Sequence, residues 1–445
     1  MYKLESELEL EFLKKKGLQV KDNALFIGNQ NCVELAEKYG TPIYVINEKV
    51  IKNRYQTLIT TLKKYYNKVR IHYAVKANTN MAILSILKNM GAYLDCVSCG
   101  EIYIAKKVGF SSDRILYTGN NYRDDELAFA LKNKVMLNLD AETQLNRLVK
   151  ILDKGFYSEK RPLLSFRVNP EFGAGHHDHC ITAGPNVKFG ILERDIVNAY
   201  EKAIQSGFEK FGIHMHIGSG ILDADIFKVA ANKYINIIRK ILDKIKINLE
   251  FIDFGGGLGI PYNPKDSPLD LEKYAQNIVE PFIKLIEDYS LNEPYLCIEP
   301  GRYIVAESCI ILAQVNTIKK MHDKYYAGID AGLNLLIRPA MYGSYHHVLV
   351  ANKINEQKVR NYNIAGPICE SGDVLARDRK LPNIEEYDII AILDAGAYGF
   401  TMNSNYNMRP RAAEILVSEN TVEIVRKGEN FEDLTSHQII PERLK

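Results

Sequence analysis

The chain has 445 residues, which is long for a single hydrophobic core, so we expect a large domain and a smaller one. Its formal net charge of +2 gives no electrostatic reason to expect nucleic acid or an anionic membrane as a partner. The N-terminus lacks the basic start and apolar core of a signal peptide, and no apolar run approaches the length of a membrane span, about 18 residues. We therefore expect a cytoplasmic protein without a membrane segment.

Between residues 70 and 300, short apolar runs alternate with stretches of helical composition. One such stretch, FKVAANKYINIIRKILDKI, has apolar residues at helical spacing. Strands that alternate with helices in this way favour an α/β fold, a (β/α)8 TIM barrel, over an open sheet. In chain order, the runs are VRIHYAVKA, AYLDCVS, RILYTGN, VMLNLD, LLSFRVNP, FGIHMHIGS, LEFIDFGGG and YLCIEPGR.

After Arg302 the pattern changes to β-rich segments with turn signals, which predict an all-β C-terminal domain. We expect the barrel to span residues 47–310 and the β domain residues 311–445, with the N-terminal segment 1–46 packing on the β domain. The β-rich segments are CIILAQVNTIKKM, KYYAGIDAG, HHVLVANKI, NYNIAGPIC, DIIAILDAGAY and RAAEILVSENTVEIVRKG.

Polar residues and glycines fall at or just beyond the ends of the predicted barrel strands. A lone lysine such as Lys76 in IHYAVKAN more often packs its stem and extends its ammonium into water. The shared position of the whole set instead favours a ring of functional groups, because the carboxyl ends of barrel strands meet at one mouth. The set is Lys76, Asp95, Asn120, Asn169, His216, Gly255, Gly256, Gly257 and Glu299.

Two short patterns raise the question of a metal. Cys96 and Cys99 form a single C-x-x-C, but a structural zinc site needs a second pair or histidines at matching spacing. HHDHC, residues 176–180, lies in a glycine-rich loop, where histidines more often touch solvent or substrate. Seven scattered cysteines also give no disulfide framework. We expect no metal at either place.

The glycines of FGGGLG follow a strand and can offer backbone amides to an anion such as phosphate, although a nicotinamide site would look similar. A lysine, a phosphate cradle and a carboxylate at three strand ends of one barrel together indicate pyridoxal 5'-phosphate. Lys76 would hold the aldehyde as a Schiff base, and Glu299 would face the pyridine nitrogen. A carboxylate at that position keeps the nitrogen protonated, which favours reactions that pass through a stabilised carbanion.

A series of motifs resembles that of the diaminopimelate decarboxylase family, in the barrel-type class of pyridoxal-phosphate enzymes that also holds ornithine decarboxylase and alanine racemase. The resemblance implies decarboxylation of meso-2,6-diaminopimelate to L-lysine and CO2, the last step of lysine biosynthesis. The motifs are HYAVKAN, DCVSCGE, GIHMHIGSG, DFGGGLG, EPGR, RPAMYGSYHH, AGPICESGD and DAGAYGFTMNSNYNMRP.

The same resemblance implies roles for individual residues. Lys76 is the Schiff-base lysine, with Asp95 and Ser98 near it, and His216 stacks on the cofactor ring. Cys369 is the catalytic acid that protonates the carbanion, and it reaches in from the other subunit of a homodimer. The further cofactor contacts that the resemblance implies are Ser219, Gly255, Gly256, Gly257, Glu299, Pro300, Gly301, Arg302 and Tyr398.

The charges of the predicted substrate site favour a substrate with a second amino-acid centre. Arg302, Arg338 and Tyr342 suit a distal carboxylate, and Glu370 suits the distal amine. The resemblance implies that Tyr398 touches both cofactor and substrate. RPAMYGS supplies no acid, whereas ornithine decarboxylase has an aspartate there for its diamine tail.

The alternative functions are a related decarboxylase, an amino-acid racemase and a non-catalytic cofactor-binding protein. A related decarboxylase would act on ornithine, arginine or carboxynorspermidine. Racemases of this fold usually place an arginine against the ring nitrogen, and Glu299 argues against one. In a non-catalytic cofactor-binding protein we would expect Lys76 or Cys369 to be lost, and the chain retains both.

Overall fold

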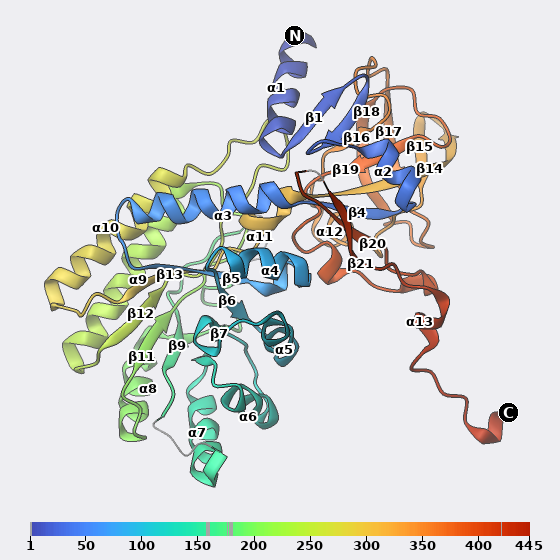
Figure 1. The fold of residues 1–445 in the computed structure, drawn as a ribbon. Helices are drawn as coiled ribbons and strands as arrows, with labels where there is room; N and C mark the ends of the chain where they lie inside the picture. The colour runs from blue at the N-terminus through green and yellow to red at the C-terminus, as the bar shows by residue number, and fades with distance from the viewer. Residues whose placement is uncertain (1, 157–160, 176, 178–180, 420) are drawn as a thin grey trace. The chain divides into compact units, whose positions relative to one another are not determined.

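The computed structural model describes all residues except 1, 157–160, 176, 178–180 and 420. The chain forms two compact units (Figure 1). The first, which we call the barrel unit, comprises Lys52–Pro261 and Ser267–Ile304. The second, which we call the β unit, comprises Met1–Ile51, Tyr262–Asp266 and Val305–Lys445.

The barrel unit is built on parallel strands that close into a cylinder. Each strand pairs with its neighbour along the chain, and β13 pairs with β5 to close the ring. The predicted (β/α)8 barrel is therefore confirmed. Its strands are β5 (Val69–Ala74), β6 (Tyr93–Cys96), β7 (Ile115–Tyr117), β8 (Met136–Leu139), β9 (Leu164–Asn169), β11 (Phe211–His214), β12 (Leu249–Asp253) and β13 (Tyr295–Ile298), with the short β10 (Ile191–Leu192) beside β9.

Amphipathic helices lie on the outside of these strands (Figure 1). In α9, Ala230, Tyr234 and Ile241 are buried at helical spacing, and the Asp223 side chain caps the first turn by accepting from the amide of Asp225. The described residues contain no helix that is both long and apolar enough to cross a membrane. The outer helices are α3 (Glu48–Lys63), α4 (Met81–Asn89), α5 (Cys99–Val108), α6 (Asp124–Lys132), α7 (Glu142–Ile151), α8 (Glu193–Gln205), α9 (Ala224–Lys244) and α10 (Leu271–Tyr289). The short α11 (Arg302–Val305) follows β13 and is buried.

The inside of the barrel contains both apolar and polar side chains. Leu116, Met136, Phe251 and Cys297 form an apolar cluster of buried residues. Fully buried polar side chains lie on the same strands or directly after them. They are His72, Asp95, Asn138, Ser165, His214 and Asp253. Such groups need partners or a ligand to offset the loss of water, which directs attention to the carboxyl ends of the strands.

The β unit is organised around a mixed sheet in the order β18-β17-β15-β14-β4-β20-β21, with β19 paired to β14 and β16. The N-terminal strand β4 lies between β14 and β20, and it contributes Ile43 and Val45 to the buried core. The sheet strands are β4 (Ile43–Asn47), β14 (Cys309–Met321), β15 (Lys324–Ile329), β16 (Val348–Val350), β17 (Arg360–Ala365), β18 (Val374–Leu381), β19 (Ile389–Ile392), β20 (Ala413–Val417) and β21 (Val422–Arg426).

The predicted β-rich second domain is confirmed, with additions that the sequence pattern did not show. Strand β18 was not predicted, because its sequence VLARDRKL carries four consecutive charged residues that hide the apolar positions. The unit also contains a small sheet and short helices. They are β1 (Leu18–Lys21), β2 (Ala24–Ile27), β3 (Gln30–Asn31), α1 (Tyr2–Lys15), α2 (Cys32–Tyr39), α12 (Arg338–Tyr342) and α13 (Phe431–Thr435).

Candidate active site

Lys76 stands directly after β5, in the short turn Val75–Ala77. The register of β5 and β6 sets Ala74 beside Asp95, and Lys76 Nζ lies 2.9 Å from Asp95 Oδ2. The lysine side chain is 33% exposed, whereas that of Asp95 is fully buried. Burial raises the pKa of Asp95, the charge of Glu299 raises it further, and Lys76 opposes both. The pair therefore holds the lysine amine at the mouth of the barrel, where a ligand can reach it.

Glu299 follows β13 and is only 2% exposed. Its Oε2 lies 3.0 Å from His214 Nε2, and its Oε1 has no hydrogen-bond partner among the described residues. Burial raises the pKa of Glu299, while Lys76 and Arg167 oppose the shift. A buried acceptor without a donor is unfavourable, and a protonated pyridine nitrogen would supply that donor. The residue therefore fits the role predicted for it.

His216 lies two residues beyond β11, and its ring orientation is set by hydrogen bonds. The Gly218 amide donates to His216 Nδ1 at 3.1 Å, and Thr182 Oγ1 lies 3.1 Å from the same nitrogen. Nδ1 is thus an acceptor, and the proton of the neutral ring is on Nε2. Burial, followed by Arg167 and Lys76, holds the pKa of His216 well below its usual value. A neutral flat ring suits the predicted stacking on a cofactor.

Arg167 and Thr182 were missed by the sequence analysis. Arg167, on β9, is 8% exposed and donates from Nη2 to the backbone oxygen of Thr182 at 3.1 Å. Arg167 could have been recognised in the sequence, because it is a charged residue inside the apolar run LLSFRVNP. Thr182 belongs to the glycine-rich loop and carried no signal, because its contact with His216 depends on how that loop folds.

The glycines after β12 are required by close approach of the backbone. Gly255 has φ +69°, and a Cβ there would lie 2.3 Å from the oxygen of Met215. A Cβ on Gly256 would lie 2.2 Å from the oxygen of Glu299. The Gly255 amide donates to Asp253 Oδ1 at 2.8 Å. This amide is therefore already hydrogen-bonded, whereas the sequence predicted that it would bind phosphate. Gly257 has φ +108°, a conformation that favours glycine.

The segment from Glu299 to Arg302 packs against the turn that carries Lys76. Pro300 accepts from the amide of Ala74 at 3.3 Å, and a Cβ on Gly301 would lie 2.9 Å from Cβ of Ala77. Arg302 begins α11 and donates from Nη2 to Ser219 Oγ at 3.0 Å. The structure thus brings the predicted residues of the barrel unit together at its strand ends.

Two other residues at the strand ends form hydrogen bonds with backbone groups, and a third is partly exposed. Ser98 caps α5 by accepting from the amide of Glu101 at 3.2 Å. Asn169 holds the glycine-rich loop, because its side chain accepts from the Gly184 amide at 3.0 Å and donates to the Gly184 oxygen at 2.9 Å. Asn120 is partly exposed beyond β7.

In the β unit, Arg338 is held in a defined position. It begins α12, is 1% exposed and packs its guanidinium 4.8 Å from the centre of the Tyr262 ring. Its Nη1 lies 2.9 Å from His346 Nε2, and His346 Nδ1 donates to the oxygen of Leu393 at 2.7 Å. His346 Nε2 is therefore the acceptor for Arg338. Tyr342, at the end of the same helix, is half-buried.

Cys369 is exposed. It is hydrogen-bonded to Asn407, a residue that was not predicted from the sequence. Asn407 Oδ1 accepts from the Cys369 amide at 3.0 Å, and Asn407 Nδ2 donates to Cys369 Sγ at 3.1 Å. Glu370 accepts from the hydroxyl of Tyr406 at 2.6 Å. Tyr398 has φ +57°, a strained conformation for a large residue that often marks functional positions.

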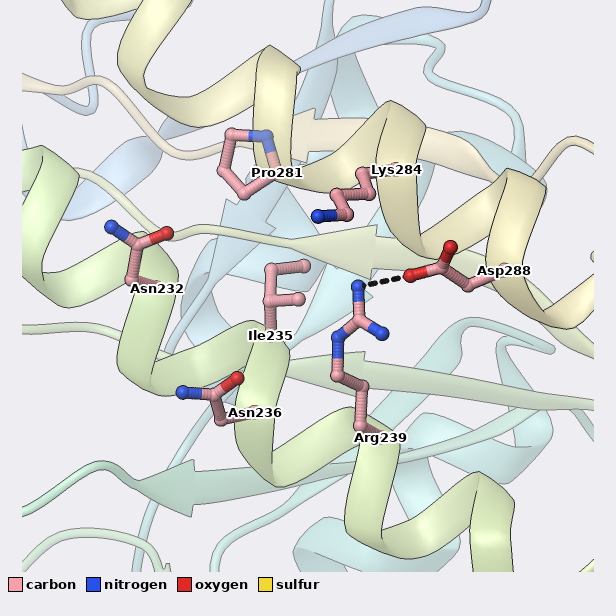
Figure 2. A pocket seen from close by; sticks show the side chains of 7 residues that line it. All are labelled: Asn232, Ile235, Asn236, Arg239, Pro281, Lys284 and Asp288. Carbon is pink, nitrogen blue, oxygen red and sulfur yellow. Dashed lines mark ion pairs between the residues drawn. The ribbon is translucent and has the colours of Figure 1, made fainter.

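Of HHDHC, only His177 is among the described residues, and the other four lie outside them. Cys96 is buried on β6, and Cys99 Sγ lies 4.0 Å from the hydroxyl of Tyr117. A cavity of about 340 Å³ lies between α9 and α10, lined by Asn232, Ile235, Asn236, Arg239, Pro281, Lys284 and Asp288 (Figure 2). Arg239 and Asp288 are paired across it at 2.6 Å, and it contains none of the predicted site residues.

Residues 50–306 match the family described as "Pyridoxal-dependent decarboxylase, pyridoxal binding domain". Diaminopimelate decarboxylase of Methanothermobacter thermautotrophicus is 50% identical over 428 residues, which cover 96% of this chain and 98% of that protein. The enzyme of the same name from Archaeoglobus fulgidus is 40% identical over 424 residues, covering 95% of this chain and 99% of that one. The crystal structure of diaminopimelate decarboxylase from M. jannaschii has a TM-score of 0.91 at 32% identity, covering 98% of this chain and 100% of that one.

These relatives span nearly the whole chain, so the similarity includes both units. The resemblance suspected from the motifs is confirmed, as is the dependence on pyridoxal phosphate. The chain belongs to the diaminopimelate decarboxylase family of pyridoxal-dependent decarboxylases.

Proposed function

We propose that the protein decarboxylates meso-2,6-diaminopimelate to L-lysine and CO2 with the help of pyridoxal 5'-phosphate. The observation that carries this function is the 50% identity over 96% of the chain to a protein named diaminopimelate decarboxylase. A related structure from M. jannaschii, described as a co-complex with L-lysine, has a TM-score of 0.90 at 32% identity and covers 97% of this chain.

The residues of the barrel unit support this chemistry. When bound, pyridoxal phosphate takes up the electron pair that remains on the substrate after CO2 leaves. Lys76 supplies the amine for the cofactor aldehyde, at the mouth of the barrel and oriented by Asp95. Glu299 offers Oε1 as an acceptor for the ring N–H and is stabilised in its ionised form by Lys76 and Arg167. His216 offers a neutral ring of fixed tautomer to the cofactor.

The β unit supplies the groups that we assign to the substrate and to proton return. Cys369 would supply the proton that replaces CO2 on the substrate, and the Asn407 side chain donates a hydrogen bond to its sulfur. By the family resemblance, Cys369 comes from the second subunit of a homodimer. Arg302 of the barrel unit takes part in substrate binding, as do Arg338, Tyr342, Glu370 and Tyr398 of the β unit. The cytoplasmic location stays a prediction of the sequence.

Ornithine, arginine and carboxynorspermidine are the substrates of the alternative reading. A lysine/ornithine decarboxylase of Vibrio vulnificus shares the fold, with a TM-score of 0.73, but only 21% of the sequence. That likeness concerns the fold alone and does not favour these substrates. A buried arginine such as Arg338 also suits a distal carboxylate better than the cationic tail of a diamine.

The test uses the purified protein loaded with pyridoxal phosphate and incubated separately with meso-diaminopimelate, ornithine and arginine. We expect release of CO2 and stoichiometric lysine from diaminopimelate, and turnover of the other two that is lower by orders of magnitude. Lys76→Ala serves as the control for activity from contaminating enzymes. Faster decarboxylation of ornithine or arginine would establish the alternative.

A further inference from the structure

Three buried ionisable side chains lie together at the ends of the neighbouring strands β11, β12 and β13. They are His214, Asp253 and Glu299, and each is at most 2% exposed. His214 stands opposite Asp253 in the strand register, and His214 Nε2 lies 3.0 Å from Glu299 Oε2. Potential ligand atoms of all three side chains lie within 4.8 Å of one another. The protonation state of each group therefore depends on the other two.

Besides Glu299 Oε1, two buried atoms of this cluster lack a hydrogen-bond partner among the described residues. Asp253 Oδ1 accepts from the Gly255 amide, whereas Asp253 Oδ2 and His214 Nδ1 have no partner in the part of the chain that the structure describes. If both atoms carried only lone pairs, two buried acceptors would lack a donor, which is unfavourable. A proton on Asp253 removes this conflict, because a carboxylic acid donates where an imidazole nitrogen accepts. The structure shows no hydrogen bond between Asp253 Oδ2 and His214 Nδ1, so this contact requires a side-chain rotation or a bridging water.

The surrounding charges decide which carboxyl group keeps the proton. Burial raises the pKa of Glu299, but the cations Lys76 and Arg167 oppose the shift. Burial also raises the pKa of Asp253 well above its ordinary value, and the carboxylates of Glu299 and Asp95 add to the shift, with Lys76 opposing it. Glu299 therefore ionises more readily, and Asp253 retains the proton.

The other groups that face the cluster are neutral near pH 7. Burial and the charge of Arg167 hold the pKa of His214 well below its usual value. Burial lowers the pKa of His72 to about 3, and burial raises the pKa of the Cys297 thiol. A neutral His214 that donates from Nε2 to an ionised Glu299 has its lone pair on Nδ1.

We propose that Asp253 is a positioning residue that acts in its protonated form, donating toward His214 Nδ1 and so fixing the tautomer in which His214 donates to Glu299. The chain of hydrogen bonds keeps Glu299 ionised and oriented toward the pyridine nitrogen of the cofactor. This inference rests on the proposed function, because it concerns how the barrel maintains the protonated ring that decarboxylation requires.

A purely structural role for Asp253 predicts that its carboxyl group is ionised in the folded state. In that case the side chain serves only to accept a hydrogen bond from the Gly255 amide through Oδ1. Asp253→Asn keeps this acceptor and places an amide N–H where the acid proton would be, so it imitates the protonated form and not the carboxylate.

The decisive measurement compares urea unfolding of full-length wild type and Asp253→Asn, without cofactor, from pH 5 to pH 8. A folded-state pKa above the unfolded value means that the folded chain holds a proton that the unfolded chain has lost in this window. The contribution of Asp253 to stability, which only wild type has, then falls as pH rises, and the ratio of wild-type to variant unfolding constants grows by about tenfold per pH unit. Parallel curves would show that Asp253 is ionised in the folded state and would overturn the proposal.

The holoenzyme gives a second measurement, with a matched pair of variants. His214→Leu removes the donor to Glu299, whereas His214→Gln keeps an amide N–H near the position of Nε2. We expect His214→Leu to shift the pH titration of the bound cofactor's absorbance and to lower kcat roughly 10- to 100-fold, and His214→Gln to restore most of both. Identical spectra and kcat for wild type and His214→Leu would refute the proposal.

The proposed function and the role of Asp253 are tested by independent measurements. The unfolding curves require neither cofactor nor substrate, and the absorbance titration requires only the cofactor. A wild-type protein that binds pyridoxal phosphate but leaves diaminopimelate unchanged contradicts the proposed function, while both readouts still decide the role of Asp253.

Discussion

Replacing Lys16 by methionine removes the cation from a buried cluster in the β unit. Lys16 Nζ lies 2.7 Å from Asp394 Oδ1 and 2.9 Å from Glu307 Oε1, and all three side chains are at most 1% exposed. The ammonium also lies 4.3 Å from the centre of the Phe12 ring. Methionine fills a similar volume, so the change isolates the loss of charge and leaves two carboxyl groups without their cation.

We expect Lys16→Met to lower the free energy of unfolding by about 3–5 kcal/mol at pH 8, the usual cost of removing one partner from a buried ion pair. The cost should shrink toward pH 5. Burial raises the pKa of Asp394 to about 7 even with Lys16 opposing the shift, and loss of the lysine raises it further. Below that pKa the carboxyl group is protonated, and the folded chain no longer carries its buried charge.

The assay is urea unfolding of the protein without cofactor, at one fixed concentration, followed by far-UV circular dichroism because the chain has no tryptophan. Lys15→Met is the matched control, since Lys15 pairs with Glu11 at 2.7 Å while 60% exposed, and it should leave stability unchanged. Adding Asp394→Asn to Lys16→Met should recover part of the loss. A cost below about 1 kcal/mol at pH 8, or one that does not change between pH 8 and pH 5, would refute this account of the cluster.

Four further outcomes test the site. Lys76→Ala should lose the long-wavelength absorbance of bound cofactor after dialysis, and a retained band would exclude Lys76 as the attachment point. Glu299→Gln should bind cofactor but turn over about 100-fold more slowly, because a neutral amide does not hold the ring proton; an unchanged kcat contradicts this reason. An equal mixture of Lys76→Ala and Cys369→Ala chains should regain about a quarter of the wild-type sites if subunits exchange randomly, and a mixture that exchanges by mass spectrometry yet stays inactive argues against a shared site. Asn407→Leu removes both hydrogen bonds to Cys369 and should lower kcat about tenfold with KM unchanged, whereas a raised KM at full kcat would assign Asn407 to substrate binding.

Local patterns in the sequence predicted the architecture of the barrel. Strand runs and helical stretches alternate along the chain. Each is recognised by the spacing of its own apolar residues, which depends only on residues that are close together in the sequence. The same reasoning located Lys76 and Glu299, because a charged residue at the end of an apolar run is visible without knowledge of the fold. Their close approach to the same mouth follows from parallel strands, whose carboxyl ends meet.

Only the tertiary structure decided which residues become partners over long sequence distances. Lys16 pairs with Asp394, 378 positions away, and the N-terminal strand β4 lies inside a sheet whose other strands come after residue 308. Likewise, nothing local indicates that Thr182 fixes the ring of His216 or that Asp253 shares a buried cluster with His214 and Glu299. Such contacts depend on strand register, loop conformation and burial, and these are set by packing against segments that are remote in the chain. A residue's pKa and hydrogen bonds are properties of that surrounding packing, which the local sequence does not contain.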